Sequence, residues 1–164
     1  KGRNEKMEKE YLLSVTAKNH TGVLLRIAGL FSRRCYNILS IVAAQSEDSE
    51  TSRLIIVVKG DDKIVRQMEK QLCKLYDVEQ VDVLNEDEAV IREYLLVKVA
   101  RNAETNAQLV AIANVFHADV LNVSENSMIL ELASNAKTLN SFVELLKPYG
   151  IQKILRTGAM AMTM

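Results

Sequence analysis

The sequence predicts an α+β protein in which two βαββαβ units follow one another. Three observations predict this fold class. Each half of the chain alternates short apolar segments of strand length with two amphipathic segments of helical period, in the same order. Polar segments rich in turn-forming residues separate these elements. A short acidic segment, residues 85–88, separates the two halves.

The first half is expected to hold four strands and two helices. The strands are expected over residues 11–17, 37–45, 52–59 and 78–84. A helix over residues 23–34 is predicted by apolar residues at helical spacing, which should form one buried stripe. That stripe consists of Leu24, Ile27, Ala28 and Phe31. A second helix should begin at Asp61 or Asp62, because aspartate is a favoured N-cap residue.

The second half repeats this order. Its strands are expected over residues 93–100, 119–124, 128–133 and 151–156, and its helices over residues 105–116 and 136–147. Pro148 and Gly150 should end the last helix. Each half then has the split-βαβ topology, an antiparallel sheet covered by two helices. The sequence therefore predicts two ferredoxin-like sandwiches in tandem.

This reading divides the chain into four segments. We expect a highly charged, disordered leader over residues 1–10 and a first domain over residues 11–84. A polar linker should span residues 85–91, and a second domain residues 92–164.

The strand at residues 54–58 reads Leu-Ile-Ile-Val-Val and is apolar on both faces. A half-solvated antiparallel strand would alternate apolar and polar residues. Two helices can cover only one face of the sheet, so another domain or subunit is expected to cover the other. We therefore expect at least a homodimer.

Composition excludes several classes of function. The 164 residues include 21 basic and 21 acidic side chains, so no net attraction to nucleic acid or to an anionic membrane is expected. The two cysteines, Cys35 and Cys73, form no CxxC motif, and the two histidines do not cluster, so we expect no metal site. Charged residues interrupt every apolar run, so no membrane span is expected. These features favour a cytoplasmic protein, or an organellar one after processing.

The segment from Asn19 to Ile38 reads NHTGVLLRIAGLFSRRCYNI and is the strongest functional signal. Gly22 lies just before the first helical turn, where unpaired N–H groups and the helix dipole favour a small anion such as a carboxylate. Asn19 and Asn37 each offer an amide that can donate and accept. This combination suits a free amino acid. From residue type alone, Asn19 could equally be a cap of the loop or helix, and Gly22 alone is more often a turn glycine that binds no ligand.

These residues resemble the amino-terminal ACT domain of acetolactate synthase regulatory (small) subunits, also called acetohydroxyacid synthase small subunits. The resemblance extends from about residue 11 to residue 162. It continues through Ser52-Arg53-Leu54, Gly60-Asp61-Asp62-Lys63, residues 64–75, the junction Arg92 to Val99, and the ending Arg156-Thr157-Gly158.

The resemblance implies an effector site shared between two subunits. The loop N–H groups of Gly22, Val23 and Leu24 are implied to hold the effector carboxylate, with Asn19 from the same subunit. Asn37 and Ile38 are implied to complete the pocket from the neighbouring subunit.

Two positions beside this site depart from the family pattern. Cys35 stands where the family usually has glycine, and a side chain there would disturb a backbone that needs positive φ. Leu39 stands where the family commonly has an acidic residue.

The resemblance also implies the function. We expect a regulatory subunit without catalytic chemistry or a cofactor of its own. Its partner would be the catalytic (large) subunit, which carries thiamine diphosphate, Mg and FAD and joins two pyruvates or pyruvate and 2-oxobutyrate. The small subunit would raise that activity and confer feedback inhibition in branched-chain amino acid biosynthesis, most often by valine.

Other functions remain open on the residues alone. A free-standing ACT-type amino-acid sensor is the main alternative. An acylphosphatase would need an arginine in its phosphate loop, and none precedes Leu25 in the first loop. An RNA-recognition motif would expose aromatic residues on its sheet, where this chain has Ile, Val and Leu.

Overall fold

The computed structural model describes residues 9–164, which form two units. The first comprises residues up to Ile91 together with Ala159–Met164, and the second comprises Arg92–Gly158. Both units follow the order βαββαβ, so the predicted fold class of two ferredoxin-like sandwiches is confirmed.

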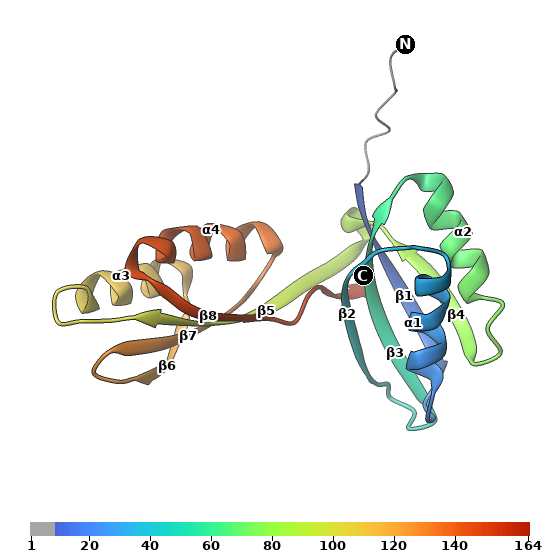
Figure 1. The fold of residues 1–164 in the computed structure, drawn as a ribbon, viewed down its shortest axis with the longest axis horizontal. Helices are drawn as coiled ribbons and strands as arrows, with labels where there is room; N and C mark the ends of the chain where they lie inside the picture. The colour runs from blue at the N-terminus through green and yellow to red at the C-terminus, as the bar shows by residue number, and fades with distance from the viewer. Residues whose placement is uncertain (1–8) are drawn as a thin grey trace, which may run out of the picture. The chain divides into compact units, whose positions relative to one another are not determined.

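The first unit is an antiparallel sheet with both helices on one face (Figure 1). The strands lie in the order β2-β3-β1-β4, which leaves β2 and β4 at the edges. The elements are β1 Lys9–Lys18, α1 Val23–Arg33, β2 Ile38–Gln45, β3 Thr51–Gly60, α2 Asp62–Leu72 and β4 Val78–Leu84. Asp61 is the N-cap of α2 and accepts a hydrogen bond from the N–H of Ile64 at 2.8 Å.

The inner core of the first unit lies between the sheet and the helices. It contains Leu13, Val15, Ile56, Met68 and Leu72, which are inaccessible to solvent. The buried stripe of α1 consists of Val23, Ile27, Leu30 and Phe31. The prediction that Leu24 and Ala28 belong to this stripe was wrong, since both are exposed. The helix is rotated so that Val23 packs on the core while Leu24 faces outward.

The outer face of this sheet is covered by the chain itself. All five residues of the apolar run Leu54–Val58 are buried, as the two-sided pattern predicted. On the outer side, Ile55 and Val57 form a cluster with Leu12, Leu84 and Ala89, and three further side chains pack against it. Those three are Ile91, Ala159 and Ala161. In Figure 1 the C-terminus lies on the sheet face opposite α1 and α2.

This arrangement corrects two predicted boundaries. The sequence analysis assigned residues 159–164 to the second domain, but they group with the first unit because Ala159 and Ala161 pack on its outer apolar cluster. A ninth strand, β9 Met160–Thr163, pairs with β5 and was not predicted.

The predicted linker, residues 85–91, contains a 3₁₀ helix at Glu86–Glu88 and the beginning of β5 at Ala89. Of the predicted disordered leader, residues 1–8 lie outside the described part, and Lys9 and Glu10 begin β1.

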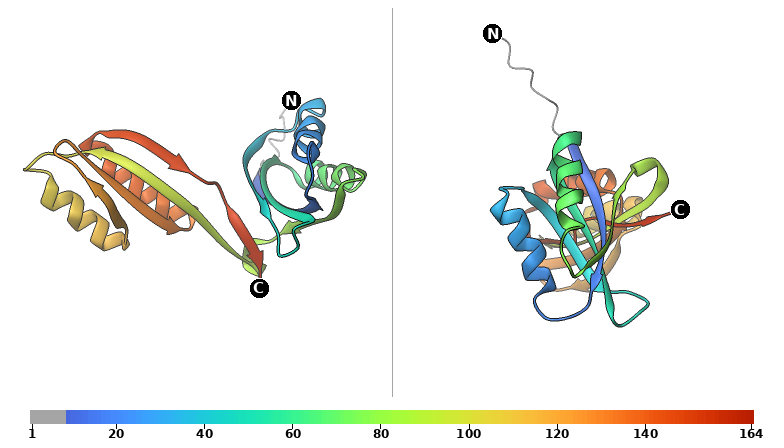
Figure 2. Two further views of the ribbon diagram at one scale, coloured as in Figure 1. Left: turned by 90° about the horizontal axis from the view of Figure 1, so that it is seen from below. Right: turned by 90° about the vertical axis from the view of Figure 1, so that its right-hand side faces the viewer.

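The second unit is also a sheet with its two helices on one face (Figure 2). Its strand order is β6-β7-β5-β8. The elements are β5 Ala89–Ala100, α3 Asn106–Phe116, β6 Asp119–Val123, β7 Ser127–Ser134, α4 Ala136–Leu146, a 3₁₀ helix Lys147–Tyr149 and β8 Ile151–Arg156. Leu95, Val97, Leu130, Leu139 and Phe142 have no solvent exposure and centre its core.

Candidate functional site

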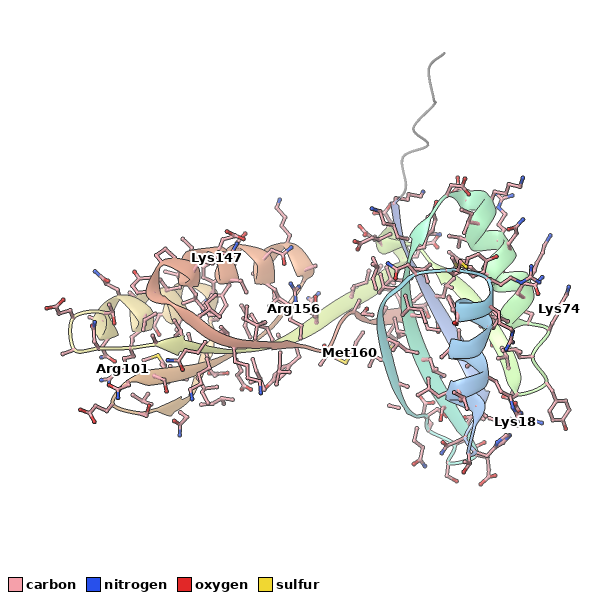
Figure 3. The ribbon with its side chains drawn as sticks, in the orientation of Figure 1. Lys18, Lys74, Arg101, Lys147, Arg156 and Met160 are labelled. Atoms are coloured by element: carbon pink, nitrogen blue, oxygen red, sulfur yellow. The ribbon has the colours of Figure 1, made fainter. Side chains whose placement is uncertain are left out.

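A cavity of about 260 Å³ opens where β1 ends and α1 begins. Figure 3 shows Lys18 in this region, at the end of β1. The lining combines the β1–α1 loop and the start of α1 with the end of β2 and the start of β3. The lining residues are Lys18, Asn19, His20, Val23, Leu24, Ala43, Ala44, Gln45, Ser52 and Leu54. Three predicted site residues, Asn19, Val23 and Leu24, therefore meet in one cavity.

Gly22 has the backbone geometry that only glycine adopts without strain. Its φ is 92° and its ψ is −10°, in the left-handed region. It is the N-cap of α1 and supplies no side-chain cap, while its carbonyl accepts the N–H of Arg26 at 3.0 Å. A Cβ added at Gly22 would meet no protein atom within 4 Å, so the space beside the helix N-terminus is open. The N–H of Val23 donates to the carbonyl of His20 at 3.4 Å, and the other N–H groups of the first turn can donate to a small anion.

Asn19 ties the β1–α1 loop to the loop between β2 and β3. Its side-chain N–H donates to the carbonyl of Ser49 at 2.9 Å, and its side-chain oxygen accepts from the hydroxyl of Ser52 at 2.9 Å. Its backbone N–H donates to the carbonyl of Glu50 at 2.7 Å. An amide oxygen has two lone pairs and an amide nitrogen two protons, so each side-chain atom keeps one further hydrogen-bonding position.

A buried carboxylate behind the loop was missed by the sequence analysis. The side chain of Asp77, in the turn between α2 and β4, is 4% exposed. It pairs with the guanidinium of Arg26, and its Oδ1 lies 2.9 Å from Nε2 of His20. Burial alone would raise the pKa of Asp77, but the hydrogen bonds and charges of Arg26 and His20 outweigh it and hold that pKa below 3.8. No local pattern in the sequence links Asp77 to residues about fifty positions earlier.

Asn37 and Ile38 do not reach this cavity within one chain. Ile38 begins β2, whereas the cavity is lined by Ala43, Ala44 and Gln45 near the end of that strand. Seven residues of strand at about 3.3 Å each put roughly 23 Å between the two ends. The six predicted site residues thus divide into two groups at opposite ends of β2.

The two departures from the family pattern lie beside the second group. Cys35 has a φ of 55°, so the backbone keeps a left-handed conformation although the residue is not glycine. Leu39 follows on the edge strand β2 with 43% of its surface exposed.

The cavity has the chemical character to take a small molecule with one anionic group and an apolar part. The beginning of α1 supplies N–H donors, and Asn19 and Ser52 supply polar side chains. Val23, Leu24, Ala43 and Leu54 supply apolar surface. Within residues 9–164, no group of three or more His, Cys, Asp or Glu side chains is arranged to hold a metal ion. No helix in that same range is long and apolar enough to cross a membrane.

Comparison with known proteins identifies both halves of the chain. Residues 13–80 match the family described as AHAS small subunit-like ACT domain, and residues 92–164 match the family described as small subunit of acetolactate synthase. The probable acetolactate synthase small subunit of Archaeoglobus fulgidus is 39% identical over 153 residues, which cover 93% of this chain and 96% of that protein. The acetolactate synthase small subunit of Bacillus subtilis is 38% identical over 151 residues, which cover 92% and 88%.

A solved structure shows the same fold over nearly the whole length. The crystal structure of the acetolactate synthase small subunit from Thermotoga maritima matches with a TM-score of 0.89 and 35% identity, covering 95% of this chain and 98% of that one. The first unit, with its βαββαβ order and the cavity beside its β1–α1 loop, defines an ACT-domain protein. The identity along the second unit goes further, and the chain belongs to the family of acetolactate synthase small subunits. The resemblance drawn from the sequence is confirmed.

Proposed function

We propose that the protein is the non-catalytic regulatory subunit of an acetolactate synthase. It activates a separate catalytic subunit and makes that subunit sensitive to a branched-chain amino acid, with valine as the first candidate. The observation that carries this proposal is the cavity at the β1–α1 loop, in which helix N–H donors stand beside apolar walls. Family membership supports the catalytic subunit as the partner, and we propose the cytoplasm as the compartment.

The cavity favours an amino acid with a small apolar side chain. The effector carboxylate accepts hydrogen bonds from the first-turn N–H groups of α1 next to Gly22. Asn19 has spare donor and acceptor capacity for the effector's polar groups. The aliphatic side chain contacts Val23, Leu24 and Leu54. Valine, leucine and isoleucine differ by a methylene or its position, so their discrimination amounts to about 1–3 kcal/mol.

A homodimer formed along the β2 edge accounts for four exposed apolar residues on β2 and at the start of α1. β2 is an edge strand, and Leu39 and Ile41 on it are 43% and 36% exposed. Leu24 and Leu25 at the start of α1 are 51% and 75% exposed. An unpaired edge next to apolar side chains is a surface that a second copy covers. The covered outer face of the sheet does not contribute to this reasoning, because residues of the same chain occupy it.

A two-fold axis beside β2 would also unite the divided site. Two β2 strands related by a two-fold axis perpendicular to them run antiparallel, so the beginning of one lies opposite the end of the other. Asn37 and Ile38 of one subunit then approach the partner's cavity near Ala43, Ala44 and Gln45. This geometry gives each cavity residues from both chains, as the family resemblance implies.

Thiamine diphosphate, Mg and FAD belong to the catalytic subunit in this proposal, and this chain supplies no catalytic group. Reconstitution tests it. The purified chain should make no acetolactate from pyruvate with all three cofactors present, should raise the rate of its catalytic subunit, and should make that rate fall on addition of valine. An amino-acid response without any effect on the catalytic subunit would instead indicate a free-standing ACT-type sensor. Turnover by the chain alone would contradict the proposal.

A further inference from the structure

We propose that Asp77 is a positioning residue of the effector site, which fixes the β1–α1 loop from behind through Arg26 and His20. This inference rests on the proposed function of the cavity and adds a residue that does not line it. Asp77 is one of three buried polar or charged residues among residues 9–164, with Glu93 and Ser127. Glu93 and Ser127 belong to the second unit.

Asp77 contacts three successive parts of the chain around the loop. Its backbone carbonyl accepts the N–H of Lys18, the last residue of β1, at 2.8 Å. Its Oδ1 lies 2.9 Å from Nε2 of His20 within the loop, and its Oδ2 accepts from Nη1 of Arg26 in α1. One residue thus holds the strand end, the loop and the beginning of the helix. Lys18 and His20 both line the cavity.

These contacts converge on the turn at Gly22. His20 lies two residues before Gly22 and accepts the N–H of Val23 on its backbone carbonyl at 3.4 Å. The N–H of Arg26 donates to the carbonyl of Gly22 at 3.0 Å. The residues that flank the turn are therefore anchored to Asp77 by their side chains and to the turn by their backbones. An anion site made of backbone N–H groups depends on such fixed geometry, because the donors must point at one position.

Charge and geometry predict opposite effects for the loss of this carboxylate. Arg26 and His20 are the groups that face Asp77, and Asp77 balances the charge of Arg26. Removal of the negative charge would leave an excess positive charge near the cavity, which would favour a carboxylate ligand by long-range attraction. Release of the loop would disfavour the same ligand. A weaker effector affinity after substitution therefore indicates positioning and not charge.

The test uses Asp77→Asn, which keeps the shape of the side chain and removes its charge. Asp82→Asn is the matched control, since Asp82 lies on β4 of the same unit and accepts a hydrogen bond only from Gln80 in the described contacts. Valine is titrated calorimetrically into the full-length chain and both variants. Amide hydrogen exchange is followed for residues 18–26 in the absence of valine.

We expect Asp77→Asn to weaken valine binding by about 3- to 30-fold, the range for residues that act through their neighbours. Exchange should rise within residues 18–26 and stay unchanged in α2, while Asp82→Asn behaves as wild type. Wild-type affinity and exchange in Asp77→Asn would overturn the positioning role and leave the proposed function intact. If the wild-type chain binds no branched-chain amino acid, the proposed function fails. Faster amide exchange of residues 18–26 in Asp77→Asn would then still show that Asp77 fixes the β1–α1 loop, and unchanged exchange would show that it does not.

Discussion

The side-chain oxygen of Asn19 accepts a hydrogen bond from the hydroxyl of Ser52 at 2.9 Å, and both residues line the cavity. Asn19 belongs to the β1–α1 loop and Ser52 belongs to β3, so this hydrogen bond joins two walls of the cavity. The sequence analysis left Asn19 open between a loop cap and an effector contact. The structure supports the structural role directly, and the remaining hydrogen-bonding capacity of the amide leaves the effector contact as a proposal.

Substitution at this pair separates the two roles of Asn19. Asn19→Ala removes the bonds to Ser49 and Ser52 together with any effector contact, whereas Ser52→Ala removes only one of these bonds. At about 0.5–1.5 kcal/mol per bond, we expect Ser52→Ala to weaken valine binding by no more than about tenfold and Asn19→Ala to weaken it further. Calorimetric titration measures the valine affinity of both variants. Equal affinities for the two variants would show that Asn19 makes no contact with the effector.

Ile41→Lys should dissociate the proposed dimer. Ile41 lies on the edge strand β2, and a lysine there would bring two like charges together across a two-fold axis. Leu155→Lys is the control, because Leu155 is an exposed strand residue of the second unit. Sedimentation velocity at micromolar concentration should show a monomer for Ile41→Lys and a dimer for the control. A wild-type chain that sediments as a monomer would rule out the shared effector site.

Cys35→Gly should stabilise the first unit. Cys35 holds a φ of 55°, which costs a non-glycine residue about 1–2 kcal/mol. Glycine removes that strain but loses more backbone entropy on folding, so we expect a net gain of about 0.5–1 kcal/mol in the free energy of unfolding. Cys35→Ala keeps the strain and should change stability little. Chemical denaturation compares the three proteins. No gain for glycine over alanine would mean that the left-handed conformation carries no cost here.

The stability of the first unit should depend on Asp77 in acid. The folded-state pKa of Asp77 lies below its ordinary value of 3.8. A carboxyl with a depressed pKa stabilises the folded state fully above its unfolded pKa, and this stabilisation is lost as the pH falls through the folded pKa. The stability difference between wild type and Asp77→Asn should therefore be constant near neutral pH and shrink below about pH 4. Urea denaturation as a function of pH measures this stability difference. A difference that grows in acid would contradict a lowered pKa for Asp77 in the folded protein.

Much of the fold follows from local pattern. Helical periodicity in each half, over residues 23–34 and from Asp61 or Asp62 in the first and over residues 105–116 and 136–147 in the second, predicted both sandwiches together with the apolar strands, because periodicity reports which face is buried. Leu24 was misplaced since a period alone does not fix the rotation of a helix within about one residue. The strand β9 was missed because Met160–Thr163 is too short to show a pattern of its own.

Some residues of the candidate site could likewise be predicted from local sequence, and others could not. The position of Gly22 before α1 and of Asn19 beside it could be predicted, since a glycine before a helix and a nearby amide have local meaning, while their contact with an effector stays a prediction. Asp77 was not, because its importance arises from burial against His20 and Arg26, which are distant in the sequence. The family resemblance alone assigned Asn37 and Ile38 to the neighbouring subunit. That contact stays a prediction, and within one chain Ile38 begins β2 while the cavity lies near the end of that strand.

The central claim is that the effector carboxylate binds the N–H groups at the start of α1, and substitution of Gly22 tests it. The direct measurement is calorimetric titration of valine into wild type and Gly22→Asp, with inhibition curves of the reconstituted enzyme. Gly22→Asn is the matched control, since it introduces the same shape at φ 92° without the charge, and both residues tolerate left-handed backbone better than most. Asn37→Ala, which removes one amide contact, should weaken binding by about tenfold at most. We predict that Gly22→Asp binds no valine and yields an enzyme that is activated but not inhibited, while Gly22→Asn retains measurable binding. Wild-type affinity and inhibition in Gly22→Asp would contradict the account and require the effector to bind elsewhere.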